Sequence, residues 1–155
     1  EDLGMIEIDW AVVLNHLITM MVAYILAFPI AWNRESETKS AGIRTFPLVS
    51  IASCGFVLIA MDIFSEPSAQ ARILEGVVTG IGFIGGGAIL KNGSSVTGLA
   101  TAASLWGTAA IGIAVGTHRL EIALLLSIVT FITLQVMAKV KSKVPENEER
   151  CDNDT

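Results

Sequence analysis

The sequence predicts an all-α integral membrane protein, a bundle of five transmembrane helices with a glycine-rich helical hairpin as its core. Of the 155 residues, 52% are hydrophobic and 16% are charged, whereas soluble domains carry roughly 25% charged residues. The charged residues gather between five long apolar segments. Between residues 76 and 116, two apolar runs rich in small residues flank a short polar link. Small residues allow the close backbone contacts by which helices associate in lipid.

The first two predicted spans are separated by a polar loop. Residues 8–32 are long enough to cross about 30 Å of hydrocarbon, and residues 46–64 form the second apolar run. The loop between them contains Arg34, Glu35 and Arg44. We therefore expect a reversal of chain direction at this loop.

The next two predicted spans form the hairpin. Glu66-Pro67-Ser68 predicts a turn and a helix start, so we expect the third span over residues 73–90. Asn92-Gly93 then breaks the helix, and the fourth span is expected over residues 99–115. The pair forms the centre of the predicted bundle.

The fifth span is expected over residues 120–138, which completes a single transmembrane domain of residues 1–138. The remaining residues, 139–155, are charged and lack apolar periodicity. Such a composition does not bury enough apolar surface to fold, so we expect a disordered cytoplasmic tail.

The basic residues predict that the N-terminus lies outside and the C-terminus in the cytoplasm. With this orientation the cytoplasmic segments hold eight basic residues and the outer segments hold two, as the positive-inside rule requires. The eight are Arg34, Lys39, Arg44, Lys91, Lys139, Lys141, Lys143 and Arg150, and the two are Arg72 and Arg119.

The glycines predict close helix packing. G-x-x-x-G spacing occurs at Gly76/Gly80 and Gly82/Gly86, and this spacing is typical of helix contacts in membranes. One stretch also matches the dinucleotide-binding fingerprint G-x-G-x-x-G, but no strand precedes it, so we favour packing. The glycines expected to make these contacts are Gly76, Gly80, Gly82, Gly85, Gly86, Gly87 and Gly112.

A polar stripe on the fourth span is a candidate binding surface. Thr101, Ser104 and Thr108 fall at positions i, i+3 and i+7, which places them on one helix face. The hydroxyl groups either bond to carbonyls of their own and neighbouring helices or form the hydrophilic wall of an ion path.

Acidic residues gather on the predicted outer side, and this rim would raise the local concentration of cations. It consists of Glu1, Asp2, Glu7, Asp9, Asp62, Glu66, Glu75 and Glu121. Glu75 is the best single candidate for a magnesium ligand, because it lies in the first turn of the predicted glycine-rich helix. It can equally pair with Arg72 at i−3, and outer loops keep acidic residues without any functional reason.

Three stretches together resemble the membrane domain of the MgtC/SapB family over about residues 23–116. They are Arg34-Glu35 followed by Ala41-Gly-Ile-Arg44-Thr45, the glycine run from Val78 to Ile89, and the segment from Gly98 to Gly112. The resemblance implies a multi-pass protein of the bacterial inner membrane that takes part in magnesium homeostasis. Longer members carry a soluble C-terminal domain, whereas this chain has only the charged tail after Ala138, so it resembles a short form.

The resemblance also points to particular residues. Those matching family positions are Arg34, Glu35, Arg44, Thr45, Gly80, Gly82, Gly85, Gly87, Asn92, Thr101 and Trp106. We place Trp106 among the packing residues and the polar ones among the candidate binding residues. The two arginines and the glutamate either form ion pairs that fix the join between the first two spans or hold an anionic lipid head group.

Two functions from different classes are consistent with these features. The first is a non-enzymatic modulator that binds another membrane complex through its small-residue faces. The alternative is an oligomeric transporter or channel for a divalent cation such as magnesium. No nucleophile, base and orienting group converge in the sequence, so we do not expect an enzyme. We expect no cofactor and no nucleic-acid partner, Mg²⁺ only as a transported or sensed ion, a lipid bilayer around the protein, and a homo-oligomer, preferably a dimer.

Overall fold

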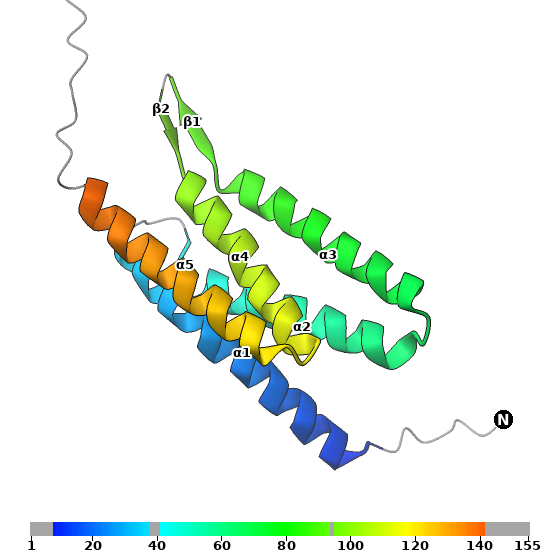
Figure 1. The fold of residues 1–155 in the computed structure, drawn as a ribbon. Coiled ribbons are helices and arrows are strands. Elements are labelled where there is room, and N and C mark those ends of the chain that lie inside the picture. The colour runs from blue at the N-terminus through cyan, green and yellow to red at the C-terminus, as the bar shows by residue number, and fades with distance from the viewer. Residues whose placement is uncertain (1–7, 38–40, 94, 142–155) are drawn as a thin grey trace, which may run out of the picture.

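The computed structural model describes residues 8–37, 41–93 and 95–141. The described chain forms five helices and one short β-hairpin (Figure 1). The elements in order are α1 (Trp10–Glu37), α2 (Thr45–Ile63), α3 (Pro67–Gly87), β1 (Leu90–Asn92), β2 (Ser95–Thr97), α4 (Leu99–Gly116) and α5 (Leu120–Lys141). The expected helical architecture is therefore found, and the β-hairpin formed by β1 and β2 is an addition to it.

The helix α4 lies at the centre of the bundle, because it packs against α1, α2, α3 and α5. The helix α3 packs against α2 and α4 and lies at the edge of the bundle (Figure 1). Two serine hydroxyls fix α1 to its neighbours. Ser50 Oγ donates to the carbonyl oxygen of Ala23 at 2.9 Å, and Ser127 Oγ donates to that of Leu26 at 2.6 Å.

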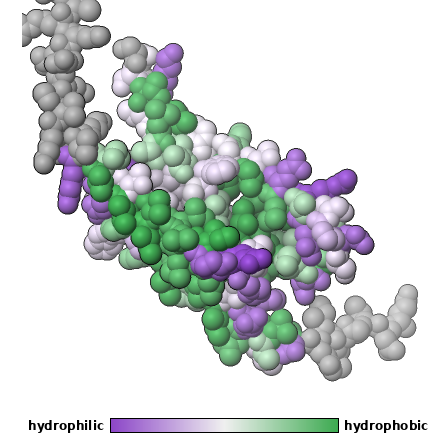
Figure 2. Space-filling model, in the orientation of Figure 1, coloured by the Kyte–Doolittle hydropathy of each residue, from purple (hydrophilic) through white to green (hydrophobic). Residues whose placement is uncertain are grey.

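Four helices are long and apolar enough to cross a membrane, namely α1, α2, α4 and α5. Among the described helices α3 does not reach this level, since it combines Arg72 and Glu75 with many glycines. Hydrophobic residues cover much of the helical surface in view (Figure 2). The described structure therefore supports a multi-pass membrane protein with four clear spans and a fifth, less apolar helix.

The ends of two helices differ from the prediction. The helix α1 continues to Glu37, so Arg34 and Glu35 lie in its last turns and not in a loop. Asn33 and Arg34 are buried, and their packing extends the helix beyond its apolar run. The helix α3 begins at Pro67, where Glu66-Pro67-Ser68 predicted a helix start, and so extends beyond the predicted span of residues 73–90.

The link between α3 and α4 also differs from the prediction. The helix α3 ends at Gly87, and residues 90–97 form an antiparallel hairpin in which Leu90 pairs with Thr97 and Lys91 with Val96. Gly93 has a φ of 62°, a left-handed conformation that glycine adopts without steric cost. The polar link, for which the sequence predicted a short turn, thus contains two short paired strands.

Candidate functional site

The polar stripe of α4 is buried inside the bundle. Thr108 Oγ1 donates to the carbonyl oxygen of Ser104 at 2.8 Å, and Ser104 Oγ donates to that of Ala100 at 2.6 Å. These two hydroxyls therefore bond to their own helix. Thr101 is 1% exposed, and its hydroxyl has no hydrogen-bond partner in the described part of the chain. Thr101 is thus the member of the stripe that has hydrogen-bonding capacity left.

Thr101 lies at the same level of the bundle as the end of α1. Ser50 donates a hydrogen bond to Ala23 and lies against Gly112. These three residues therefore lie at the same level, that is, at the same height along the axis of the bundle. Arg34 follows Ala23 by eleven residues and Thr101 precedes Gly112 by eleven. At 1.5 Å per residue both lie about 16 Å from that level, and in the same direction, because α1 runs antiparallel to α4.

This end of the bundle therefore holds a cluster of buried polar residues. Asn33 and Arg34 are both buried. Asn33 Oδ1, like Thr101 Oγ1, has no hydrogen-bond partner among the described residues. Buried polar atoms are costly unless they are hydrogen-bonded, so Asn33 Oδ1 and Thr101 Oγ1 are unfavourable at this end of the bundle unless they find a partner.

Glu35 organises the turn into α2. Its Oε2 accepts a hydrogen bond of 3.0 Å from the backbone N–H of Ile43. A Cβ atom at Gly42 would collide with the same carboxylate. Glu35 therefore holds the turn by a contact that requires glycine at position 42, which favours a structural role for this residue. Arg44 is exposed and Thr45 is half-buried at the start of α2.

The acidic residues of the predicted outer rim do not form a metal site among the described residues. Glu75 is exposed on α3, and no group of three His, Cys, Asp or Glu side chains is arranged to hold a metal within the described residues. Glu75 forms no ion pair with Arg72 there. Glu1, Asp2 and Glu7 and the side chain of Asn92 lie outside the described part of the chain.

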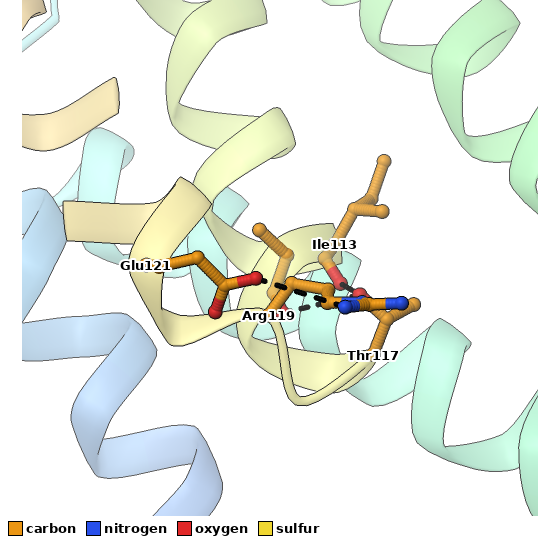
Figure 3. A network of polar contacts seen from close by, with 5 residues as sticks. Ile113, Thr117, Arg119 and Glu121 are labelled. Atoms are coloured by element: carbon orange, nitrogen blue, oxygen red, sulfur yellow. Dashed lines mark hydrogen bonds and ion pairs between the residues drawn. The ribbon is translucent and has the colours of Figure 1, made fainter. Parts of the chain in front are cut away.

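An exposed ion pair marks the link between α4 and α5 (Figure 3). Arg119 Nη1 lies 3.8 Å from Glu121 Oε1. Beside it, Thr117 Oγ1 donates to the carbonyl oxygen of Ile113 at 3.0 Å. Both partners of the ion pair are exposed, so it contributes little to stability. We therefore do not count Arg119 and Glu121 among the candidate binding residues.

The glycines of α3 do not make the close contacts that a tightly packed hairpin would require. A Cβ atom at Gly85 would lie 3.5 Å from the carbonyl oxygen of Ala102 on α4. At the other five predicted positions of α3 a Cβ atom would meet nothing within 4 Å; these are Gly76, Gly80, Gly82, Gly86 and Gly87. Trp106 is 53% exposed. The closest glycine contact of the predicted set is made by Gly112, between α4 and α2.

A groove of about 730 Å³ runs between α2 and α3. Gly76 and Gly80 form part of its α3 wall, which explains why they meet no neighbour. The α2 wall, which the sequence did not predict, consists of Leu48, Val49, Ala52, Ser53 and Phe56. Their apolar pattern resembles that of any membrane helix, so only the pairing of α2 with α3 identifies them.

Comparisons with known proteins agree with this architecture. The model of the MgtC family matches residues 20–143. "Putative magnesium transporter YhiD" of Escherichia coli K12 is 35% identical over 127 residues, covering 77% of this chain and 59% of that protein. "Protein MgtC" of Salmonella typhimurium LT2 is 35% identical over 114 residues, covering 74% of this chain and 48% of that protein.

A third relative, "Uncharacterized protein slr0014" of Synechocystis sp. PCC 6803, is 37% identical over 116 residues, covering 75% of this chain and 49% of that protein. The matched region thus spans about half the length of these relatives. No solved structure matches the chain.

Proposed function

The chain belongs to the MgtC family, and from this premise we propose that it supports magnesium homeostasis in the bacterial inner membrane as a non-enzymatic modulator of another membrane complex. The names of the matched relatives, "Protein MgtC" and "Putative magnesium transporter YhiD", support the link to magnesium. The family match covers most of α1 and all of α2 to α5, so the proposed modulator acts through contacts inside or beside the bilayer.

The observation that carries this proposal is the outward face of α3, which we define as Glu75, Thr79, Gly82 and Gly86. With 3.6 residues per turn, each residue advances about 100° around the helix. Gly82 therefore lies about 120° around the helix from Gly76, which lines the groove, and all four residues of the outward face fall within about 60° of one another. All four are exposed, and neither glycine has a neighbour within 4 Å of its Cβ position.

Such a face is suited to a partner helix. In lipid, helices associate through small residues that allow close backbone contact and interhelical hydrogen bonds. The outward face offers two glycines, one hydroxyl and one carboxylate in a row. We propose that it binds either a second copy of the chain, giving a dimer, or a helix of the regulated complex.

We also propose the membrane orientation in which the hairpin end of the bundle faces the cytoplasm. Four basic residues lie near the hairpin end of the bundle, namely Arg34, Arg44, Lys91 and Lys139. Two lie near the opposite end, Arg72 close to the start of α3 and Arg119 in the link between α4 and α5. The positive-inside rule favours this orientation. Cysteine labelling from the outside tests it: a cysteine introduced at Arg119 should react in intact cells, and one introduced at Lys91 should not.

Complementation of a deletion strain tests whether the chain acts as a modulator through the outward face of α3. In a host strain that lacks its own MgtC-family protein, Gly82→Leu and Gly86→Leu should abolish growth in magnesium-poor medium while the variants remain folded in the membrane. Gly80→Leu, the same change on the groove side of the helix, should retain more activity. Equal growth of all three variants would contradict docking through the outward face.

The second candidate is a transporter or channel for a divalent cation. Thr101, with a buried hydroxyl that has no partner in the described chain, favours it, as does the name of the Escherichia coli relative. Purified protein in liposomes that contain a magnesium-sensitive dye distinguishes the two functions. An inward magnesium flux that is abolished by Thr101→Val would establish transport. If the protein is folded but no magnesium enters, the modulator remains the proposed function.

A further inference from the structure

The groove between α2 and α3 is lined mainly by apolar side chains and has one arginine at each end. Its walls include Phe56 and Ile84, and the missing side chains of Gly76 and Gly80 leave it wide. Arg44 lines it at the start of α2, and Arg72 lines it near the start of α3. Since α2 and α3 are joined by a short turn and run in opposite directions, the two arginines lie at opposite ends.

The two guanidinium groups have no ionic partner among the described residues. Within the described residues neither Arg44 nor Arg72 forms an ion pair or a side-chain hydrogen bond. The carboxylate of Glu35 lies against Gly42 and accepts a hydrogen bond from the backbone N–H of Ile43, and no ion pair joins it to Arg44 among the described residues. Arg72, in contrast, has Glu75 one helical turn away, which disfavours an anion at that end.

The dimensions of the groove fit one lipid chain. The lining residues on α2 extend from Arg44 to Phe56, a rise of about 18 Å at 1.5 Å per residue. The hydrocarbon of one leaflet is about 15 Å thick, half of the roughly 30 Å core. A chain whose head group lies at Arg44 would therefore follow the groove to about its far end.

We propose that this groove binds an anionic phospholipid, with the phosphate at Arg44 and Thr45 and one acyl chain along Gly76 and Gly80. Arginine binds phosphate through paired charge-assisted hydrogen bonds, and basic pockets between helices on the cytoplasmic side are typical head-group sites. The lipid would fill the space between α3 and α2 and so hold α3 in place. This site is separate from the outward face of α3 proposed to bind a partner.

The test uses the full chain reconstituted in bilayers that contain photoactivatable phosphatidylglycerol or the matching phosphatidylcholine, each with the reactive group on an acyl chain. We expect phosphatidylglycerol to label peptides of α2 and α3 in the groove, and phosphatidylcholine to label them about tenfold less. Arg44→Ala should lower the phosphatidylglycerol labelling roughly tenfold, as expected for loss of a charge-assisted contact. Arg119→Ala, an exposed arginine at the α4–α5 link, is the matched control and should have no effect.

A second pair of variants tests the acyl chain. Gly80→Leu fills the groove and should abolish labelling, whereas Gly82→Leu places the same side chain on the outward face and should leave it unchanged. Thermal unfolding in detergent confirms that both variants fold. Equal labelling by the two lipids, unchanged labelling in Arg44→Ala, or a loss caused by Arg72→Ala alone would overturn the proposal, as would labelling of Gly80→Leu at the wild-type level.

Discussion

Gly112 on α4 lies against the carbonyl oxygen of Ser50 on α2, so closely that no side chain fits at position 112. A Cβ atom there would also lie 3.0 Å from Ser53 Cβ. The contact brings the backbones of two central helices together, which is how small residues stabilise helix pairs in lipid. Because Ser50 also bonds to Ala23 of α1, one point joins three helices.

Gly112→Ala should therefore destabilise the bundle. The methyl group must displace backbone atoms, and overpacking of this kind costs about 1–3 kcal/mol. Thermal or denaturant unfolding of purified protein measures the change. Gly86→Ala is the matched control, since that position is open, and its stability should be close to wild type. Equal stability of the two variants would contradict the observed contact.

Glu35→Ala should destabilise the start of α2. The substitution removes the acceptor of the Ile43 N–H and opens space beside Gly42, and because this hydrogen bond is exposed its loss costs about 0.5–1.5 kcal/mol. Glu35→Gln should cost less, because its amide oxygen still accepts the hydrogen bond. Glu75→Ala, which removes an exposed carboxylate, should leave the free energy of unfolding unchanged. A larger loss for Glu75→Ala than for Glu35→Ala would refute the structural role.

Arg34→Ala and Arg44→Ala should differ in protein abundance. Arg34 is buried at the end of α1, and its removal should lower the amount of folded protein in the membrane several-fold. Arg44 is exposed, so its removal should leave abundance normal. Quantitative immunoblotting of membrane fractions checks both. A low level of Arg44→Ala would indicate a structural role for this arginine as well.

Thr101→Val should keep or raise stability, by at most about 1 kcal/mol, because it replaces a buried hydroxyl that has no partner in the described structure. Thr108→Val removes a satisfied hydroxyl and should cost about 0.6 kcal/mol. Unfolding measurements on both variants test this. A marked loss of stability in Thr101→Val would show that its hydroxyl is bonded in the membrane.

Gly82→Leu should disperse the proposed dimer, because it covers the outward face of α3 with a bulky side chain. Gly80→Leu, on the groove side, should leave the assembly intact. Crosslinking in native membranes and light scattering in detergent report the oligomeric state. A Gly82→Leu protein that assembles as the wild type does would exclude this face as the dimer contact.

The sequence predicted the helical architecture well, because spans such as α2 and α4 are long and apolar. It predicted the end of α1 wrongly, since Arg34 was expected in a loop but lies in the last turns of the helix and is buried. The strands β1 and β2 have three residues each, too few to produce a detectable alternation.

The roles of the individual glycines could not be predicted. Periodicity places Gly76 and Gly85 on opposite sides of α3 with Gly82 between them, but which side meets α2, α4 or the exterior depends on tertiary packing. In the structure Gly85 faces Ala102, Gly76 lines the groove, and Gly82 is open. The candidate site was only partly predictable. The polar stripe of α4 follows from the spacing of residues on one helix, whereas the groove depends on how α2 and α3 pack against each other.

The modest apolarity of α3 has a consequence for biogenesis. A segment with an arginine, a glutamate and many glycines partitions poorly from the translocon into lipid by itself. The short β-hairpin ties α3 to the more apolar α4, so the two can enter the bilayer as one unit after α4 has been synthesised. We therefore expect a chain truncated before Leu99 to insert α3 into the bilayer less completely than the full chain does.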